Sequence, residues 1–330
     1  MSKIKRCVSL YSFQDAYATG RMTLDDIFGE LVKMEVEGIE FITDQMMHNT
    51  PFPTKETLAN WDRMMNKYNT LTPVVMDIFI NSNLYSNRTL TKKERTAELL
   101  NEIELANRLG FKIVRMVCHT QADILREALP VAEKYGITLT FEIHGGLGFG
   151  TEITQEQYKV IRELGSPNLG FVVDASLFSR GLPRKVKIYS ERMGMSPDVT
   201  AYMDNMYKTG RDPLTEFKNG YPQDLKDLFK SPVDSMAGMV GDMNENHPMS
   251  LLDEYMPYVK HFHGKIYGMT NGEADGFNTA EIINYLDSQG YEGYIATEYE
   301  GQRFKGIDEE SDELETVRQH QQLLKKCIRT

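Results

Sequence analysis

The 330-residue sequence has few cysteines and no excess of basic residues. Cys7, Cys118 and Cys327 are far apart and form no Cys-x-x-Cys pair, which argues against a disulfide framework and against a thiolate zinc site. The net charge of 37 − 48 = −11 argues against a nucleic-acid-binding surface, which needs clustered Lys and Arg, and against docking on an anionic membrane. With 41% hydrophobic residues, the composition is that of a globular protein with a large core.

Long apolar runs are also missing. No stretch approaches the roughly 18 consecutive apolar residues that a membrane-spanning helix needs. The segment after the basic N-terminal residues, 8–13, is too short and too polar for the core of a signal peptide, and it is more typical of a first β-strand. We therefore expect a soluble, cytoplasmic protein.

What the chain does contain is a regular alternation of helix signals and strand-like runs. Glycines follow predicted helices and precede β-rich runs, as expected of residues that end a helix in the left-handed conformation; they are Gly38, Gly110, Gly136 and Gly290. Three predicted helices begin with the spacing of a capping box; the pairs are Thr23/Asp26, Thr91/Glu94 and Thr154/Gln157.

The β-rich runs number eight. They are Arg6–Ser12, Gly38–Thr43, Leu71–Phe79, Lys112–Cys118, Thr138–Ile143, Leu169–Asp174, Val259–His263 and Tyr294–Glu298. Eight strands alternating with helices favour a (β/α)8 TIM barrel over a doubly wound sheet. The G-x-G-x-x-G signature of a dinucleotide fold is absent after the first strand.

The regular spacing breaks once. Residues 175–257, after the predicted sixth strand, are polar, rich in methionine and much longer than an ordinary βα connection. We interpret residues 1–330 as a single barrel domain and 175–257 as a helical insertion at the C-terminal rim, which serves as a lid or as a subunit contact. No Pro/Gly/Ser-rich linker brackets this insertion as a separate domain.

Four successive strand ends carry side chains that bind metals. They are Glu142, Asp174, His263 and Glu298. Because the C-terminal ends of barrel strands meet at one mouth, three carboxylates would repel one another there unless a cation lay between them. Three oxygen ligands and one nitrogen suit Mn²⁺, Mg²⁺ or Co²⁺, and Mn²⁺ is our first choice. The alternative is that each side chain is a solvated rim residue.

Other residues near these strand ends are candidates for contact with a substrate. His144 lies two residues after Glu142, hence on the same face, and an imidazole there is the best candidate for a general acid or base. The alternative is a loop histidine that only hydrogen-bonds a backbone carbonyl. Lys265, Arg303 and His119 are candidate substrate-binding residues, whereas His261 is expected to pack inside the barrel.

At these residues the sequence resembles the xylose-isomerase-like barrels of the sugar isomerase/epimerase superfamily. The resemblance runs through F-E-I-H (141–144), F-V-V-D (171–174), K-H-F-H-G-K (260–265) and G-Y-I-A-T-E-Y-E-G (293–301). It implies one divalent metal ion bound by Glu142, Asp174, His263 and Glu298. The chain departs from many epimerases at Leu177, where they have a histidine, and at Gly264-Lys265, near which they have an aspartate.

Further motifs look most like the α subunit of bacterial C-glycoside deglycosidases. They are V-S-L-Y-S-F-Q-D (8–15), R-G-L-P-R (180–184), H-F-H-G-K-I-Y-G-M (261–269) and E-Y-E-G-Q-R (298–303). This resemblance implies cleavage of the carbon–carbon bond of 3-oxo-C-glycosides with flavonoid-type aglycones, by C2 proton abstraction and β-elimination, in a hetero-oligomer with a small β subunit. The alternatives are a metal-dependent isomerase or epimerase of a ketose or sugar phosphate, and an inactive sugar-binding barrel.

Overall fold

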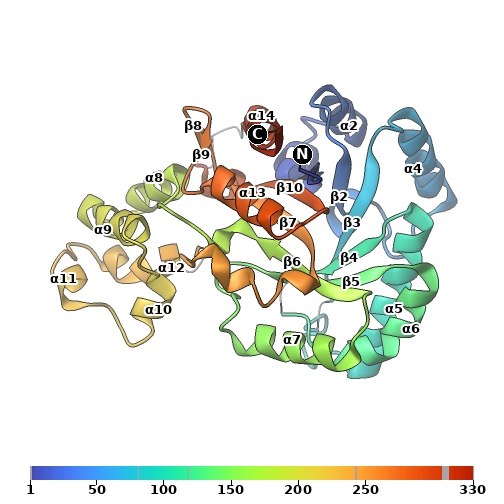
Figure 1. Cartoon of the computed structure of the whole chain (residues 1–330), viewed down its shortest axis with the longest axis horizontal. Coiled ribbons are helices and arrows are strands. Elements are labelled where there is room, and N and C mark those ends of the chain that lie inside the picture. The colour runs from blue at the N-terminus through green and yellow to red at the C-terminus, as the bar shows by residue number, and fades with distance from the viewer. Residues whose placement is uncertain (1, 81, 118, 242–243, 307–311, 330) are drawn as a thin grey trace.

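The structure is a computed structural model that describes residues 2–80, 82–117, 119–241, 244–306 and 312–329. The eight predicted strands form a closed parallel barrel in the order β1-β10-β7-β6-β5-β4-β3-β2 (Figure 1). Their bounds are β1 (Lys5–Ser9), β2 (Gly38–Ile42), β3 (Thr72–Ile78), β4 (Ile113–Met116), β5 (Thr138–Ile143), β6 (Leu169–Asp174), β7 (Val259–Ile266) and β10 (Tyr294–Tyr299). The prediction of an α/β TIM barrel is confirmed.

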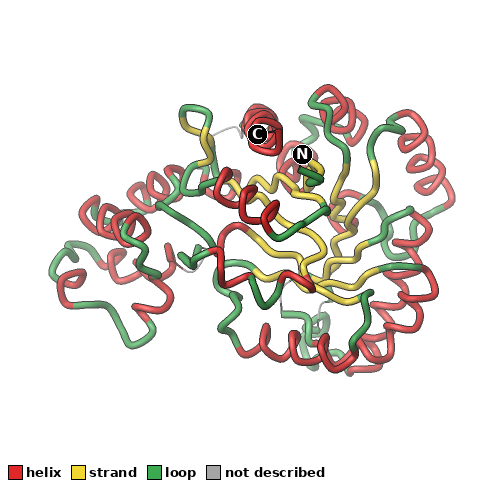
Figure 2. The backbone as a smooth tube through the Cα atoms, in the orientation of Figure 1, coloured by secondary structure: helices red, strands yellow, loops and turns green. Residues whose placement is uncertain are grey.

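Helices surround this barrel, so that the strands lie inside and the helices outside (Figure 2). The α-helices are α1 (Gln14–Ala18), α2 (Leu24–Lys33), α3 (Thr43–Met46), α4 (Lys55–Lys67), α5 (Lys92–Leu109), α6 (Leu125–Tyr135), α7 (Glu152–Leu164), α8 (Arg184–Arg192), α9 (Pro197–Lys208), α10 (Pro213–Phe217), α11 (Gln223–Lys226), α12 (Ala237–Gly241), α13 (Thr279–Ser288) and α14 (Glu313–Arg329). A two-stranded hairpin, β8 (Met269–Thr270) with β9 (Glu273–Ala274), follows β7 outside the barrel. In the part of the chain that is described, none of these helices has the length and apolar character needed to cross a bilayer.

Two strand ends differ from the sequence prediction by three residues. β1 ends at Ser9, because residues 10–13 turn into the 3-10 helix η1 (Leu10–Phe13). β7 continues three residues beyond the predicted end at His263, so that Lys265 belongs to the strand. The predicted strand end at Cys118 lies outside the described residues.

The helix termini confirm most of the local predictions and correct two. The capping boxes at Thr23 and Thr91 are present, but α7 begins at Glu152 with Thr151 as its N-cap, so no capping box forms at Thr154. Gly38 does not end a helix. It begins β2, where an added Cβ would lie 2.5 Å from a methyl carbon of Val74, so glycine is needed for close packing.

Aromatic side chains pack between the barrel and its helices on the side of α4. Trp61 stacks on Phe41 of β2 with a 5.2 Å centroid distance and lies 5.6 Å from Phe111. Its indole N–H donates to the Leu109 carbonyl at 3.1 Å, which satisfies the one polar atom of this ring. Trp61 is therefore part of the core.

The segment between β6 and β7 contains α8 to α12, and Figure 1 shows α9 to α12 as a lobe beside the barrel. Asp234 holds this lobe together. Its carboxylate accepts hydrogen bonds from the Ser196 amide and hydroxyl and from the amides of Lys230 and Ser231, all at 2.6–2.8 Å. Burial alone would raise the pKa of Asp234, but these bonds lower it to about 2.

Helix α5 buries a carboxyl that nothing neutralises. Glu102 Oε2 has no hydrogen-bond partner among the described residues. Burial, together with the charges of Asp44 and Glu98, raises the pKa of Glu102 to about 8. The folded protein therefore binds a proton that the unfolded chain releases above pH 4–5, and stability falls as the pH rises between these two pKa values.

Glu102→Gln is expected to raise the free energy of unfolding on the order of 2–3 kcal/mol at pH 7. Below about pH 4 the gain should vanish, because the carboxyl is then protonated in both states. Urea unfolding of both proteins across this pH range is the measurement. Glu104→Gln, on an exposed position of the same helix, is the matched control and should change little. An equal gain from both variants would contradict the assignment.

Candidate metal centre and active site

The four predicted metal ligands converge at one end of the barrel. Each ligand lies near the C-terminal end of one strand: Glu142 on β5, Asp174 on β6, His263 on β7 and Glu298 on β10. These four strands are consecutive neighbours in the barrel. Each residue offers one ligand atom, and the four atoms lie within 4.8 Å of one another. All four side chains are buried. The parallel register therefore brings together residues that are up to 156 positions apart in the sequence.

The imidazole of His263 supplies the test of whether this cluster fits a metal ion. Its Nδ1 atom lies 3.3 Å from Glu142 Oε1, 3.5 Å from Asp174 Oδ2 and 3.3 Å from Glu298 Oε2. It is buried and has no hydrogen-bond partner among the described residues. A ring nitrogen facing three carboxylate oxygens is the ligand arrangement that a divalent cation takes. The residues fit the ion.

The other nitrogen of the same ring is held by a carboxylate deeper in the barrel. His263 Nε2 lies 2.8 Å from Glu40 Oε2, and the carboxylate can only accept, so Nε2 carries the proton. This tautomer leaves the Nδ1 lone pair aimed at the cluster. Burial alone would raise the pKa of Glu40, but His263 and Arg115 hold it well below its usual range. His261 packs inside the barrel, as predicted, with Nε2 at 3.1 Å from Glu40.

An arginine beneath the four ligands was missed by the sequence analysis. Arg115 of β4 has a 4% exposed side chain, and its Nε lies 2.5 Å from Asp77 Oδ1 while Nη1 lies 2.8 Å from Glu142 Oε1. Nη2 is 3.7 Å from Glu40 Oε1. The sequence does hold a signal for this charge cluster. Glu40, Asp77 and Arg115 are charged residues in the otherwise largely apolar strands β2, β3 and β4.

The charges around the four ligands need a further cation. The buried carboxylates counted here are Glu40, Glu142, Asp174, Glu298 and Glu300, and the buried cations among them are Arg115 and Lys265. Asp77 is left out because burial raises its pKa well above the usual value. Five negative and two positive charges leave −3 with neutral histidines, and a divalent ion reduces this to −1. Burial alone would raise the pKa of Glu142, but Arg115 and His263 lower it to about 2, so this ligand is ionised.

Lys265 lies closer to the metal ligands than expected of a residue that only contacts substrate. Its ammonium nitrogen is 3.4 Å from Asp174 Oδ2, 3.3 Å from Glu298 Oε2 and 3.2 Å from Glu300 Oε1. Burial would lower the pKa of Lys265, but Asp174, Glu300 and Glu298 raise it well above the usual value, which keeps the side chain charged. Arg303, the other predicted substrate-binding cation, pairs with Glu300 at 3.0 Å.

These residues line a cavity of about 400 Å³, which we call the metal pocket. Its walls include Glu142, Glu298, Lys265, Arg303 and His144, together with Tyr11, Ile42, Phe79, Arg115, Val117, Gly145 and Glu300. The structure thus brings the predicted base, two of the three predicted substrate-binding residues and two of the four candidate ligands to one cavity.

His144 lines the metal pocket and hydrogen-bonds a backbone carbonyl of its own loop. Its Nδ1 lies 2.7 Å from the Gly145 carbonyl oxygen, which can only accept, so Nδ1 carries the proton in the neutral ring. The lone pair is then on Nε2. The bond to a backbone carbonyl, which the sequence analysis gave as the alternative to a catalytic role, is present. The role of His144 as a base therefore stays a prediction.

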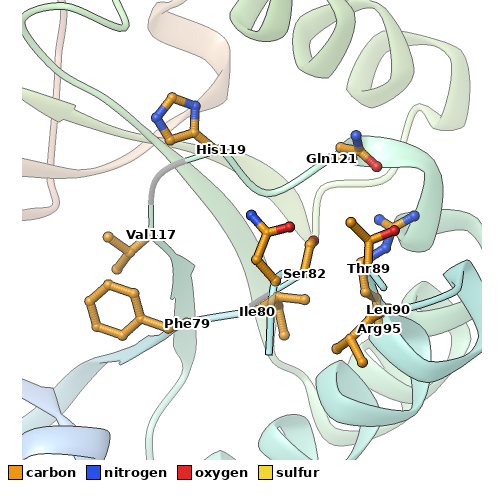
Figure 3. A pocket seen from close by; sticks show the side chains of 10 residues that line it. Phe79, Ile80, Ser82, Thr89, Leu90, Arg95, Val117, His119 and Gln121 are labelled. Atoms are coloured by element: carbon orange, nitrogen blue, oxygen red, sulfur yellow. The ribbon is translucent and has the colours of Figure 1, made fainter. Parts of the chain in front are cut away.

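His119 lies outside the metal pocket. It lines a second cavity of about 570 Å³, which we call the rim pocket (Figure 3). Phe79 and Val117 line both cavities, so the two are neighbours. His119, the third predicted substrate-binding residue, therefore lies beside the metal pocket and not in it.

Comparison with known proteins supports the sequence resemblance. Residues 28–194 match the profile of the family described as xylose isomerase-like TIM barrel. The chain belongs to this family. It is 25% identical to a C-glycoside deglycosidase alpha subunit of Arthrobacter globiformis, covering 99% of this chain and 93% of the relative. It is 26% identical to the 3'-dehydrocarminate deglycosidase alpha subunit of Microbacterium sp, covering 97% and 94%.

Solved structures show the same fold. The D-psicose 3-epimerase of Clostridium cellulolyticum H10 superposes with a TM-score of 0.60 at 12% identity, over 98% of this chain and 99% of the epimerase. The predicted resemblance to sugar isomerases and epimerases, and to the α subunits of C-glycoside deglycosidases, is confirmed.

Proposed function

We propose that this chain is the α subunit of a metal-dependent C-glycoside deglycosidase. The reaction is cleavage of the carbon–carbon bond between a 3-oxo sugar and a flavonoid-type aglycone. The observation that carries the proposal is the cluster of Glu142, Asp174, His263 and Glu298 beside His144, in a chain that aligns with such α subunits over nearly its whole length. The named relatives and the fold support an enzyme of related function.

The residues of the metal pocket can perform the proton transfers of this reaction. His144 Nε2 takes the proton from C2, and the electron pair of that bond moves toward the 3-oxo oxygen. Lys265, a buried cation, donates a hydrogen bond to the oxygen that gains charge. Return of the electron pair restores the 3-oxo group, forms the C1–C2 double bond and breaks the bond from C1 to the aryl carbon. The aryl carbon takes up the proton held by His144, which returns to its neutral form. A divalent cation held by the four ligands, Mn²⁺ in our proposal, supplies Lewis-acid polarisation of the substrate oxygens.

A sugar epimerase would use the same cluster but needs a second group for reprotonation. Leu177, at the position where many epimerases have a histidine, is fully buried in the 3-10 helix η3 (Ala175–Leu177). It offers no proton donor. This supports the lyase over the isomerase or epimerase.

The partner in the proposal is a small β subunit, since the relatives are named as alpha subunits. We assign the contact to the insertion of residues 175–257. Four of the large apolar side chains that are exposed in the described structure lie there: Ile188, Met193, Met236 and Met239. Three of the four are methionines, whose flexible side chains are frequent at protein-binding surfaces.

The test is release of aglycone from a 3-oxo-C-glycoside such as oxidised puerarin. We expect turnover with Mn²⁺, none with chelator, and a loss of 10²-fold or more in kcat for His144→Ala, since a positioned base contributes about 10²–10⁴-fold. Each assay is run with and without the small subunit. No aglycone under any condition, combined with exchange of a ketose C2 proton into solvent, would establish the epimerase instead.

A further inference from the structure

The rim pocket extends the metal pocket toward the loops that follow β3 and β4. Phe79 directly follows β3 and Val117 directly follows β4, and both side chains line both cavities. Figure 3 shows Phe79 and Val117 on one side of the rim pocket, with Thr89, Leu90 and Arg95 on the opposite side. A substrate with its reacting carbon in the metal pocket can therefore continue past Phe79 into the second cavity.

The walls of the rim pocket combine an apolar surface with neutral polar groups. Phe79, Ile80, Leu90 and Val117 provide the apolar part. Phe79 is 42% exposed, which is unusual for a phenylalanine in a folded protein and leaves its ring available for contact. Gln121 and His119 provide exposed hydrogen-bonding side chains on the other strand-end loop. This mixture suits a flat aromatic group that carries hydroxyls.

The charge of the rim pocket argues against a phosphorylated ligand. Arg95 is the single Lys or Arg among its described lining residues. Nη1 and Nη2 of Arg95 each donate a hydrogen bond to the Asp123 carboxylate at 2.8 Å, and the Arg95 side chain is 8% exposed. The charge of Arg95 is therefore already neutralised. A phosphate would find no cation here to replace its hydration.

The backbone at His119 places a side chain where an ordinary strand end would not. His119 has φ = 58°, in the left-handed region that non-glycine residues rarely adopt. Such conformations cluster at ligand-binding positions, where the surrounding fold maintains them. In Figure 3 the imidazole of His119 lies on the same side of the cavity as Val117, beyond the end of β4.

We propose that the rim pocket is the subsite for the aglycone, a planar hydroxylated aromatic group, and this proposal rests on the proposed function. Phe79 stacks on the ring system at the passage between the two pockets. Gln121 and His119 hydrogen-bond its hydroxyls. The cavity volume of about 570 Å³ is within the range of sites for ligands of this size, roughly 300–1,000 Å³.

Calorimetric titration of the Mn²⁺-loaded protein with the free isoflavone daidzein tests the subsite without turnover. We expect saturable binding that weakens about tenfold in Phe79→Ala. Binding should also weaken several-fold in Gln121→Ala. Gln121 is exposed, so this truncation should leave the fold intact. Phe52→Ala is the matched control, because Phe52 is 70% exposed and lines neither pocket. It should bind daidzein as the wild type does.

The subsite would be overturned by the absence of saturable binding to the wild type, or by equal affinity in Phe79→Ala, Gln121→Ala and Phe52→Ala. Competition by inorganic phosphate would also overturn it. The 3-oxo-C-glycoside assay separates this proposal from the proposed function. Turnover with unchanged KM in Phe79→Ala would contradict the aglycone subsite but support the proposed function. Daidzein binding that depends on Phe79, without any turnover, would contradict the proposed function but support a binding site for hydroxylated aromatic groups in the rim pocket.

Discussion

Replacement of Arg115 by methionine is expected to lower the free energy of unfolding by about 3–5 kcal/mol, the loss typical when one partner of a buried ion pair is removed. The guanidinium of Arg115 lies between Asp77 and Glu142 and near Glu40, all buried. Without it, these carboxylates remain buried in the barrel and lose the guanidinium that pairs with them. Urea unfolding followed by circular dichroism measures the loss.

Arg108→Met is the matched control for this variant. Arg108 bonds Asp62 with two nitrogens, at 2.9 and 2.6 Å, but both side chains are about half exposed. Solvent screens such a pair, and its loss should cost no more than about 1 kcal/mol. Arg115→Lys should fall between the two, because an ammonium keeps the charge but cannot bond Asp77 and Glu142 in the same geometry. If Arg115→Met and Arg108→Met were equally stable, the charge cluster would not be a structural element.

The second large effect is expected at the metal cluster. Addition of Mn²⁺ to chelator-treated protein, at a free concentration 100 times Kd, should stabilise the fold by about 2.7 kcal/mol, because the ion binds the folded state alone. Glu298→Gln removes one of three carboxylate ligands and should weaken Mn²⁺ binding by at least about 10²-fold, beyond the loss seen when an outer partner of a ligand is removed. Calorimetry and thermal unfolding measure both quantities without any substrate.

Glu300→Gln is the control for the ligand variant. Glu300 lies two residues further along the chain and pairs with Lys265 and Arg303, outside the four-ligand cluster. Its loss should weaken Mn²⁺ binding less than Glu298→Gln does, by roughly 10–100-fold at most, which is the range for outer partners of a ligand. Equal affinity in Glu298→Gln and the wild type would mean that the cluster does not hold the ion. If Glu300→Gln weakened Mn²⁺ binding as much as Glu298→Gln does, Glu300 would have to be counted among the metal ligands.

Much of this fold could be predicted because the information is local. The alternation of apolar strands with capped helices predicted eight strands, and six of the eight have ends within two residues of the structure at the positions that it describes. The exceptions have local tertiary causes. β1 stops early because Ser12 Oγ accepts a hydrogen bond from the Tyr299 amide of β10, which needs the turn of η1. β7 runs on because residues 264–266 pair with residues 297–299 of β10.

The four candidate ligands were also predictable, for a topological reason. In a parallel barrel every strand ends at the same rim, so Glu142, Asp174, His263 and Glu298 had to meet once the strands were assigned. No such rule identifies a residue in the middle of a strand. Arg115 and Glu40 become partners of Glu142 and His263 only when the inward face of each strand is known.

The sequence by itself therefore determined the barrel and the residues at its mouth, because hydrophobic periodicity and helix signals act over a few neighbouring positions. The tertiary structure alone decided the rest. It showed that Lys265 lies among the ligands, that Glu40 selects the tautomer of His263, and that His119 belongs to a second cavity behind Phe79. These depend on strand register and on burial, which bring distant charges within 4 Å of one another in a medium where they cannot be screened.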